Sequence, residues 1–394
     1  MSVRVDVAVI GGGVIGSSIA YHVARRGRRV AVFDIAAPAS APSASWASAG
    51  GVRQQGRDPR EWRLTREAAA RWPALTTELG ADLEYRQGGH LHLVERDEDL
   101  RALEARVARE RAAGLDVHMV YDRDLRAVAP DVMASARAGA YSPGDGQANP
   151  RLTTRAFAAA AVARGATYYT SAAPARLLHD GDRIEGVESA AERAAAEWVV
   201  LAAGAWSTPV AAEVGLDLPI ATRAPQMLLT DPAPAALVPT VTAAGHRLSL
   251  KQLPSGEFFI GGGWPSDIDH KRMSCAVRSE HVDRSRCVAA AVFPPLRLRR
   301  IAQVWCGLEA QSIDGVPLLG MVPGLDGLCV AVGFSGHGFQ LSPAVGRAVA
   351  DLLTGRWTEA LEPLSPSRFV SLAAAAIRAF RSEADTGIPP GALG

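Results

Sequence analysis

The 394-residue sequence has only four cysteines, and their spacing excludes several classes of protein. They form no CxxC pair and none of the spacings typical of zinc ligands; they are Cys275, Cys287, Cys306 and Cys329. We therefore expect reduced thiols rather than a disulfide framework. His90 and His92 alternate along one predicted strand, but no third ligand accompanies them, so no metal site is expected.

Neither sign of charge is in excess. The 42 basic residues nearly balance the 41 acidic ones, so no net field attracts nucleic acid or an anionic membrane. The first residues, MSVRVDVAVI, lack the layout of a signal peptide and the length of a membrane span. We expect a cytoplasmic protein without a membrane span. Only two of the basic residues are lysines, Lys251 and Lys271, and both are candidates for a specific role.

The sequence does contain a large apolar fraction, 48% of its residues, in a chain long enough for two or three packed lobes. The pattern predicts a buried strand over 5–10, a helix over 14–26 and a second strand over 28–34, which together form a βαβ unit. The alternation then stops, because residues 36–51 are rich in proline, serine and alanine. A loop of that length inside a compact lobe is usually functional.

Apolar periodicity and glycine stops predict the remaining elements. Helices are expected over 61–80, 100–114 and 149–166, and strands over 87–94 and 196–207. Residues 218–300 have a strand-like and irregular pattern that includes a hairpin over 251–264. Residues 328–355 predict a strand, a glycine-rich turn and a helix, and the tail 384–394 is expected to be mobile.

The first glycine cluster, in VAVIGGGVIGSSIA (7–20), has the spacing of a dinucleotide grip. Gly11 permits the tight turn, Gly13 lets the backbone approach a pyrophosphate, and Gly16 allows close contact between helix and strand. The phosphates would bind the free N–H groups at the N-terminus of the helix. Asp34 ends the second strand, where its carboxylate can accept hydrogen bonds from the ribose hydroxyls.

Two observations favour FAD over NAD as the dinucleotide. An NAD domain continues the alternation of strands and helices, whereas here one unit is followed by a long loop. A second glycine-rich turn, GFSGHGF (333–339), opens a helix near the other end of the chain. Two such turns suit an extended FAD, with its pyrophosphate at one turn and its isoalloxazine at the other. The helix N-terminus at the second turn would stabilise the negative charge of the reduced ring.

These residues together resemble the D-amino-acid oxidase superfamily of FAD-dependent amine oxidoreductases. The branch with sarcosine oxidase, glycine oxidase and D-hydroxyproline dehydrogenase-like proteins is the most similar. The resemblance covers most of the chain and is carried by VAVIGGGVIGSSIAYHVARRG, SASWASAGGVRQQ, DGQANPRLTTRAFAAAAVARGA, VVLAAGAWS, LPSGEFFIGGG, WCGLEAQSIDGVPLLG and GFSGHGFQLSPAVGRAVADLL. It implies a mixed α/β fold in which a Rossmann-like FAD-binding domain is interleaved with an antiparallel-sheet substrate domain. The implied FAD-binding domain is 1–80, 141–217 and 301–383, and the substrate domain is 81–140 and 218–300.

The resemblance also implies how the cofactor is held. The loop after the second strand would pass beside the flavin. Some relatives attach FAD through a histidine that would fall at Ala47, and others through a cysteine that would fall at Gly307, next to Cys306, so FAD is expected to be non-covalent here. The expected cofactor-binding residues are Gly11, Gly13, Val14, Ile15, Gly16, Asp34, Ser45, Ala47, Ser48, Gly50, Gly51, Ala203, Gly204, Trp206, Gly307, Asp314, Gly333, Gly336, His337, Gly338, Phe339 and Gln340.

Four residues are implied in catalysis or substrate binding. Arg53 falls where relatives keep an arginine near the flavin and the substrate carboxylate, and a planar guanidinium suits such a clamp; an exposed loop arginine is the alternative. Lys271 lies near the position of an oxygen-activating lysine, where a cation stabilises superoxide-like charge, although its polar surroundings are equally typical of a surface loop. Lys251 begins a hairpin of the substrate lobe. Gln340 stands where sarcosine oxidases have a carboxylate-binding lysine, which argues against sarcosine itself.

The activity implied is oxidation of a small amine or amino acid (a D-amino acid, glycine or an N-alkyl amino acid). The α-hydrogen would pass as hydride to flavin N5, water would hydrolyse the imine, and O2 or another acceptor would take the electrons. The sequence shows no Ser–His–Asp, zinc or paired-carboxylate arrangement, as expected when the cofactor carries the chemistry. Open alternatives are a dye- or quinone-linked dehydrogenase subunit with partner chains, an FAD-binding assembly or scaffold protein, and a nicotinamide enzyme. A homo-oligomer is also compatible.

Overall fold

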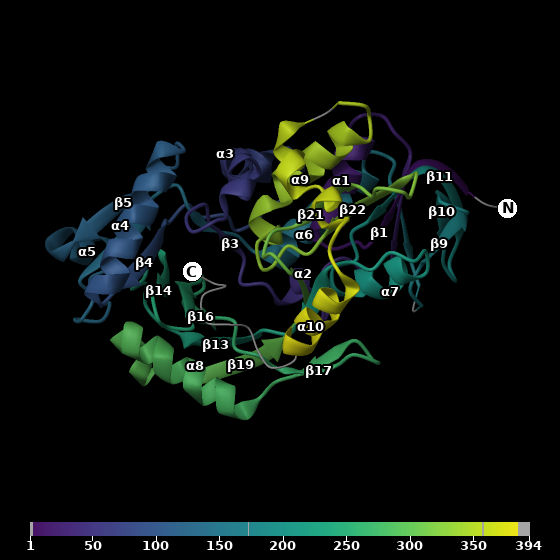
Figure 1. Ribbon diagram of the computed structural model, residues 1–394. Helices are drawn as coiled ribbons and strands as arrows, with labels where there is room; N and C mark the ends of the chain where they lie inside the picture. The colour runs from purple at the N-terminus through teal and green to yellow at the C-terminus, as the bar shows by residue number, and fades with distance from the viewer. Residues whose placement is uncertain (1–2, 172, 357, 385–394) are drawn as a thin grey trace.

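The computed structural model describes residues 3–171, 173–356 and 358–384, and it contains two large sheets at opposite sides of the molecule (Figure 1). The predicted tail lies, apart from residue 384, outside the described residues. Within the part that is described, none of the helices is long and apolar enough to cross a bilayer.

The first sheet has eight strands and is parallel at its centre. β1 (Val3–Ile10) pairs in parallel with β2 (Val30–Asp34) and with β11 (Arg193–Leu201). β8 (Thr167–Thr170) extends the sheet beyond β2, and β22 (Leu328–Val332) extends it beyond β11, both in parallel. The antiparallel strands β21 (Leu318–Met321), β10 (Arg183–Glu188) and β9 (Arg176–Asp180) complete it.

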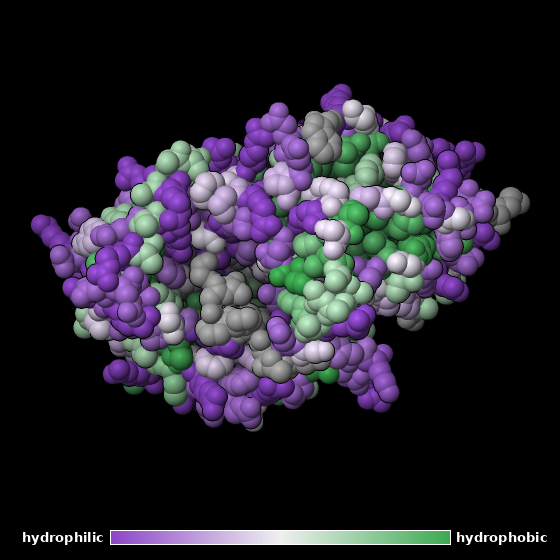
Figure 2. Space-filling view, viewed as in Figure 1, coloured by the Kyte–Doolittle hydropathy of each residue, from purple (hydrophilic) through white to green (hydrophobic). Residues whose placement is uncertain are grey.

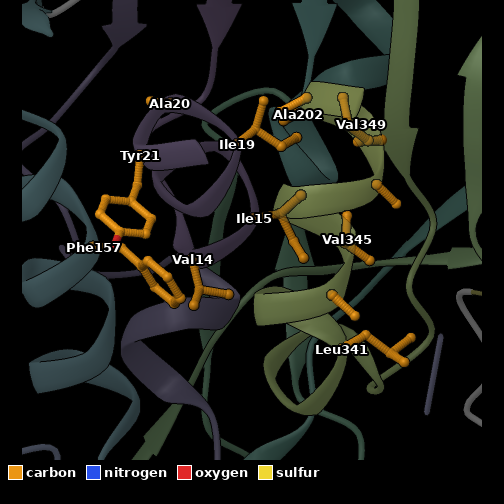
Figure 3. Close-up of a cluster of buried hydrophobic side chains, with 14 of the residues drawn as sticks. Val14, Ile15, Ile19, Ala20, Tyr21, Phe157, Ala202, Leu341, Val345 and Val349 are labelled. Atoms are coloured by element: carbon orange, nitrogen blue, oxygen red, sulfur yellow. The ribbon is translucent and has the colours of Figure 1, made fainter. Parts of the chain in front are cut away.

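Helix α1 (Val14–Ala24) is buried along its whole length and packs between α6 (Pro150–Val162) and α9 (Gly338–Leu352). Figure 3 shows Ile15 and Ile19 of α1 facing Leu341, Val345 and Val349 of α9, with Val14, Tyr21 and Phe157 on the other side. The Ser18 hydroxyl donates to the Ser342 carbonyl over 2.7 Å. A Cβ atom on Gly346 would come within 2.1 Å of Ser18 Oγ, so the two helices can approach this closely only without a side chain there.

The second sheet also has eight strands and is largely antiparallel. β14 and β4 form its one parallel pair among the described strands. In spatial order the strands are β19 (Ile301–Cys306), β13 (Gln226–Pro232), β16 (Glu257–Gly261), β15 (Ser249–Gln252), β14 (Thr240–Ala243), β4 (His90–Val94), β6 (Ala138–Ser142) and β5 (His118–Tyr121). The helices α4 (Asp97–Ala112), α5 (Asp122–Val128) and α8 (Ser279–Val292) pack around this sheet. Hydrophilic side chains cover the outer faces of α4 and α5 at the left of Figure 2.

Further helices and small sheets complete the described fold. The remaining helices are α2 (Ala44–Ala47), α3 (Trp62–Leu79), α7 (Ser207–Ala212) and α10 (Ala374–Ala384), and the 3₁₀ helices are η1 (Pro59–Glu61), η2 (Gly204–Trp206), η3 (Pro294–Leu298), η4 (Glu359–Leu364) and η5 (Pro366–Phe369). Three two-stranded sheets pair β3 (Gly51–Val52) with β7 (Gly146–Gln147), β12 (Ile220–Arg223) with β20 (Glu309–Ser312), and β17 (Asp267–Asp269) with β18 (Ser274–Ala276).

The predicted mixed α/β class is confirmed, with two local differences. The sequence pattern missed α8, because only Ser285, Ala289 and Val292 of its fourteen residues are buried and the apolar face is too narrow to show periodicity. β19 pairs with β13 in the second sheet, although its residues fall in a segment predicted for the FAD-binding domain. The residue limits of the two domains otherwise stay a prediction.

Candidate functional site

A cavity with a volume of about 340 Å³ runs between the two sheets. One wall is formed where the parallel strands β1, β2, β11 and β22 end, by residues such as Ile10, Asp34, Ala202 and Gly333. The opposite wall comes from the face of the second sheet. The carboxyl edge of a parallel sheet is the usual ligand-binding edge of such folds.

The first glycine turn closes one end of the cavity tightly. Gly11 has φ +107°, and a Cβ there would lie 2.4 Å from the Ala202 carbonyl oxygen. The backbone N–H of Gly12 donates to the Asp34 carboxylate, and the N–H of Val14 donates to Ser45 Oγ over 2.9 Å. This end is therefore a bare backbone surface at a helix N-terminus, which suits a phosphate group.

Asp34 lies at that same end and is largely shielded from water. Its second carboxylate oxygen accepts from the N–H of Ala36 over 2.9 Å. Burial raises the pKa of the Asp34 carboxyl, and the N–H groups of Gly12 and Ala36 oppose that rise. A carboxylate oriented by two backbone donors is a suitable acceptor for sugar hydroxyls.

The second glycine turn lines the same cavity. Gly333 and Gly336 have φ +71° and +83°, and α9 begins directly after His337. His337 Nδ1 lies 3.0 Å from Glu61 Oε2, and the Glu61 side chain is completely buried. Burial lowers the pKa of His337 to about 4, so the neutral ring donates from Nδ1 and keeps Nε2 as an acceptor.

Arg53 lines the cavity with a guanidinium that has no described partner. No hydrogen bond or ion pair joins this guanidinium to another residue of the described chain. Burial lowers the pKa of Arg53 to about 9, and the positive charges of Arg57 and Arg106 contribute to the shift. Arg57 lines the same cavity, and its Nε donates to the Arg53 carbonyl over 3.3 Å. A buried cation short of counter-charge favours an anionic ligand.

Acidic side chains fix the loop that carries Arg53. Asp145 Oδ1 accepts from the backbone N–H of Gln54 over 2.9 Å, and Glu110 Oε1 accepts from the N–H of Gly56 over 2.6 Å. Burial raises the pKa of Asp145 to about 7, although Gln54 and Arg53 oppose the rise. The acids hold the backbone, and the Arg53 guanidinium stays directed at the cavity.

The wall from the second sheet is polar. His90, Thr240, Thr242 and Ser249 line it. The Thr242 hydroxyl lies 2.8 Å from His92 Nδ1 and 3.2 Å from His90 Nε2. Burial lowers the pKa of both imidazoles, that of His92 to about 3. The described part of the chain shows no cluster of three or more His, Cys, Asp or Glu that could hold a metal.

Most predicted cofactor residues lie on this one cavity. Those that line it are Gly11, Gly13, Val14, Ile15, Asp34, Ser45, Ala47, Ser48, Gly50, Gly51, Ala203, Gly204, Trp206, Gly307, Gly333, Gly336, His337, Gly338 and Phe339. Gly16 does not line it, because its Cα faces the Gly11 carbonyl, which a Cβ would meet at 1.8 Å. Its place matches the predicted helix–strand contact rather than a contact with the cofactor.

Two residues predicted to contact the cofactor have side chains that are directed away from the cavity, so their contact with the cofactor stays a prediction. The Gln340 side chain is 1% exposed, and its Nε2 donates to the Thr65 carbonyl over 3.0 Å between α9 and α3. The Asp314 carboxylate pairs with Arg60 at 2.6 Å and Arg368 at 3.0 Å. Both side chains hold elements together and neither lines the cavity.

The two lysines also lie outside the cavity, so the roles predicted for them need correction. Lys251 is buried with Nζ 5.3 Å from the centroid of the Phe259 ring, and burial lowers its pKa to about 7. Lys271 is exposed on the turn between β17 and β18, where its backbone N–H donates to Asp269. Its polar surroundings reflect that surface turn.

Sequence reasoning missed several residues of the site: Gly12, Arg57, Thr240, Thr242, Ser249 and Glu309. Arg57 and Glu309 carried a signal, because one follows Arg53 by a helical turn's length and the other stands inside the WCGLE stretch. The threonines carried none, since only the pairing of β14 with β4 brings them to the cavity.

The residues present fit an extended dinucleotide. Two glycine turns line one cavity; a Cβ on Gly11 would fill the first, and an oriented carboxylate accompanies it. A Cβ on Gly307 would lie 2.2 Å from the Ala47 Cβ, so neither position has room for a larger side chain. That contact agrees with a non-covalently held group.

Comparison with known proteins also indicates a dinucleotide-binding oxidoreductase. The chain is 30% identical over 377 residues to a glycine oxidase of Geobacillus kaustophilus, covering 94% of this chain and 98% of the relative. The crystal structure of glycine oxidase from Geobacillus kaustophilus is similar with TM-score 0.84 and 29% identity, over 94% of this chain and 100% of that one. The crystal structure of L-proline dehydrogenase from P. horikoshii is similar with TM-score 0.86 and 26% identity, over 94% and 98%.

The name of a further relative identifies it as one subunit of an enzyme. The sarcosine oxidase subunit beta of Arthrobacter sp is 26% identical over 382 residues, covering 92% of this chain and 91% of the relative. Residues 6–352 match the DAO family, described as FAD dependent oxidoreductase. The chain therefore belongs to this family of FAD-dependent oxidoreductases, and FAD is its cofactor.

Proposed function

We propose that this enzyme oxidises a small amino acid or N-alkyl amino acid at the carbon next to nitrogen, giving an imine that water hydrolyses. FAD-dependent oxidation of amines or amino acids is the activity that its family and its relatives support in general terms. The observation that carries the finer proposal is Arg53, a half-buried arginine on the wall of the FAD cavity whose guanidinium has no partner among the described residues. A carboxylate is the ligand that such a group binds best.

In this proposal the chain's own residues bind and orient. Arg53 takes the substrate carboxylate, with the charge of Arg57 beside it. The polar wall of His90, Thr240 and Thr242 faces the bound amino acid. FAD, when bound, would supply the acceptor for the hydride that leaves the α carbon. Alignment of the C–H bond with the acceptor then contributes more to the rate of oxidation than a strong side-chain base would.

The turn at Gly333–His337 has an electrostatic role in the same proposal. Backbone N–H groups at the start of α9 carry partial positive charge that stabilises an anionic ring beside them. His337, held neutral and oriented by Glu61, adds no net charge there. The helix N-terminus and the charges of Arg53 and Arg57, which also act on His337, then supply the positive potential.

The test is an anaerobic titration of the FAD-loaded protein with a panel of D-, L- and N-methyl amino acids. We expect at least one to bleach the visible flavin absorbance. In Arg53→Met the concentration needed should rise by about 10- to 150-fold, because a charge-assisted hydrogen bond contributes about 1.5–3 kcal/mol. Arg101→Met, at an exposed position on α4, is the matched control and should behave as wild type. Bleaching at the same concentrations in Arg53→Met would refute the carboxylate clamp.

A second candidate is a dehydrogenase subunit that passes electrons to partner chains. The name of the sarcosine oxidase subunit beta of Arthrobacter sp favours it. After anaerobic bleaching, admission of air separates the two, because an oxidase regains its colour quickly and such a subunit does not. If no amino acid bleaches the protein, an FAD-binding assembly or scaffold role gains instead.

A further inference from the structure

We propose that Glu309 recognises the substrate's amino group and takes up its ammonium proton before oxidation. The inference rests on the proposed function, because it assigns the second half of amino acid recognition to a residue on the same cavity as Arg53. Neither the sequence motifs nor the relatives' names assign a role to Glu309.

The position of Glu309 is the first support. It lines the cavity, and its Oε2 lies 3.8 Å from where a Cβ of Gly336 would stand, so the carboxylate is beside the second glycine turn. Its carboxylate forms no hydrogen bond or ion pair with another residue of the described chain. The Glu309 carboxylate therefore faces the cavity beside the second glycine turn, and no other described residue occupies it.

The backbone around Glu309 holds it firmly. β20 pairs with β12, with Arg223 opposite Glu309. On the other side, the N–H of Ser335 donates to the Ala310 carbonyl over 3.1 Å, which ties β20 to the glycine turn. The carboxylate is therefore presented from a fixed element rather than from a loose loop, as a recognition group requires.

The charges on the cavity wall match an amino acid. Four residues with formal charge line it among those that the structure describes: Asp34 lies beside the first glycine turn, and Arg53, Arg57 and Glu309 remain for the substrate. An amino acid carries one carboxylate and one ammonium group. Arginine for the carboxylate and Glu309 for the ammonium complement both charges, whereas arginines alone would serve a simple carboxylic acid equally well.

Burial also gives Glu309 a suitable proton affinity. It raises the pKa of the carboxyl to about 7, and Arg223, the charged group facing it from β12, opposes the rise. In the proposed step one proton moves from the substrate ammonium nitrogen to a Glu309 carboxylate oxygen. The products are a neutral amine, whose lone pair can assist loss of hydride, and a neutral carboxylic acid. An acceptor poised near neutral pH suits such a transfer.

The experiment compares two unreactive ligands by their perturbation of the flavin spectrum. Propionate carries only the carboxylate, and glycine betaine adds a fixed positive charge on a nitrogen that has no lone pair to support oxidation. In Glu309→Gln we expect the Kd of glycine betaine to rise by about tenfold or more while that of propionate stays the same or falls. Glu185→Gln, exposed on β10, is the matched control and should change neither.

A pH profile adds a readout that a structural role would not move. With the best amino acid of the panel, the rate of anaerobic flavin reduction should rise around pH 7 in wild type. In Glu309→Gln the rise should move toward the pKa of the free amine. Glu309→Asp, which keeps a carboxylate, should restore much of the wild-type profile if the Gln variant binds FAD poorly.

Two results would overturn the inference. One is an equal change, or no change, in the affinities for the two ligands in Glu309→Gln. The other is an unshifted pH profile. Failure of the proposed function gives a different result, because Arg53→Met would then leave propionate binding intact.

Discussion

There is no room for a side chain at Gly11. This allows a sharp test of whether the first glycine turn approaches the backbone after β11 as closely as the structure shows. In Gly11→Ala the new Cβ would stand 2.4 Å from the Ala202 carbonyl oxygen and 2.8 Å from the Ala203 Cα. Both neighbours are backbone atoms that follow the central strand β11, so they cannot turn aside as a flexible side chain would. The φ of +107° is in addition a conformation that L-residues rarely adopt.

The two costs can be added. Holding an L-residue at such a φ costs about 1–2 kcal/mol, and forcing backbone apart in a packed interior costs about 1–3 kcal/mol. We therefore expect Gly11→Ala to lower the free energy of unfolding by about 2–5 kcal/mol, a large part of an ordinary protein's total of about 5–15 kcal/mol. The strain falls on the FAD cavity, so FAD affinity should fall as well.

The matched control is Gly245→Ala. Gly245 has φ +74°, but nothing lies within 4 Å of its Cβ position, so only the conformational cost of about 1 kcal/mol applies. Thermal unfolding at a fixed excess of FAD, with fluorescence titration of FAD into the stripped protein, measures both effects. If Gly11→Ala melts like Gly245→Ala and binds FAD like wild type, the turn does not approach β11 as described and the reasoning fails.

Two further changes have expected outcomes. Ser45→Ala should weaken FAD binding and cost about 1 kcal/mol of unfolding free energy, because the N–H of Val14 loses its 2.9 Å acceptor; an unchanged FAD titration would contradict this. Lys251→Met should raise stability at pH 6 and have less effect at pH 9, because burial lowers the pKa of Lys251 to about 7 while the unfolded chain keeps its usual value near 10.5. Between these two values the unfolded state binds more protons, so wild-type stability rises with pH, and Lys251→Met should lose that rise in urea unfolding. Identical slopes in the two proteins would count against a lowered pKa of Lys251 in the folded state.

The sequence was sufficient where function depends on backbone geometry. The motif around Gly11 and the turn around Gly336 both have positions that only glycine fills, and both turns line the cavity. Strands β1 and β2 and helix α1 were predicted within a few residues of their observed ends, because their apolar periodicity follows directly from burial.

The sequence was insufficient where function depends on side-chain direction. Gln340 follows the cofactor turn in sequence, but one further residue along α9 points it at α3 instead of the cavity. Glu309 reaches the cavity because β20 pairs with β12, a contact between segments far apart in the chain. A single sequence does not reveal which distant segments pair. Motif position alone therefore assigned Gln340 to the cofactor and overlooked Glu309.

The close contact between α1 and α9 fixes the distance between the two glycine turns, and we expect that distance to limit the length of the ligand. Each helix begins at one glycine turn, and the pair is locked by Ser18 against Ser342 and Gly346. The span between the two turns is thus determined by interior helix packing and not by any surface loop. A nucleotide too short to bridge that span engages one turn only. Gly346, which touches no part of the cavity, helps decide which lengths are accepted.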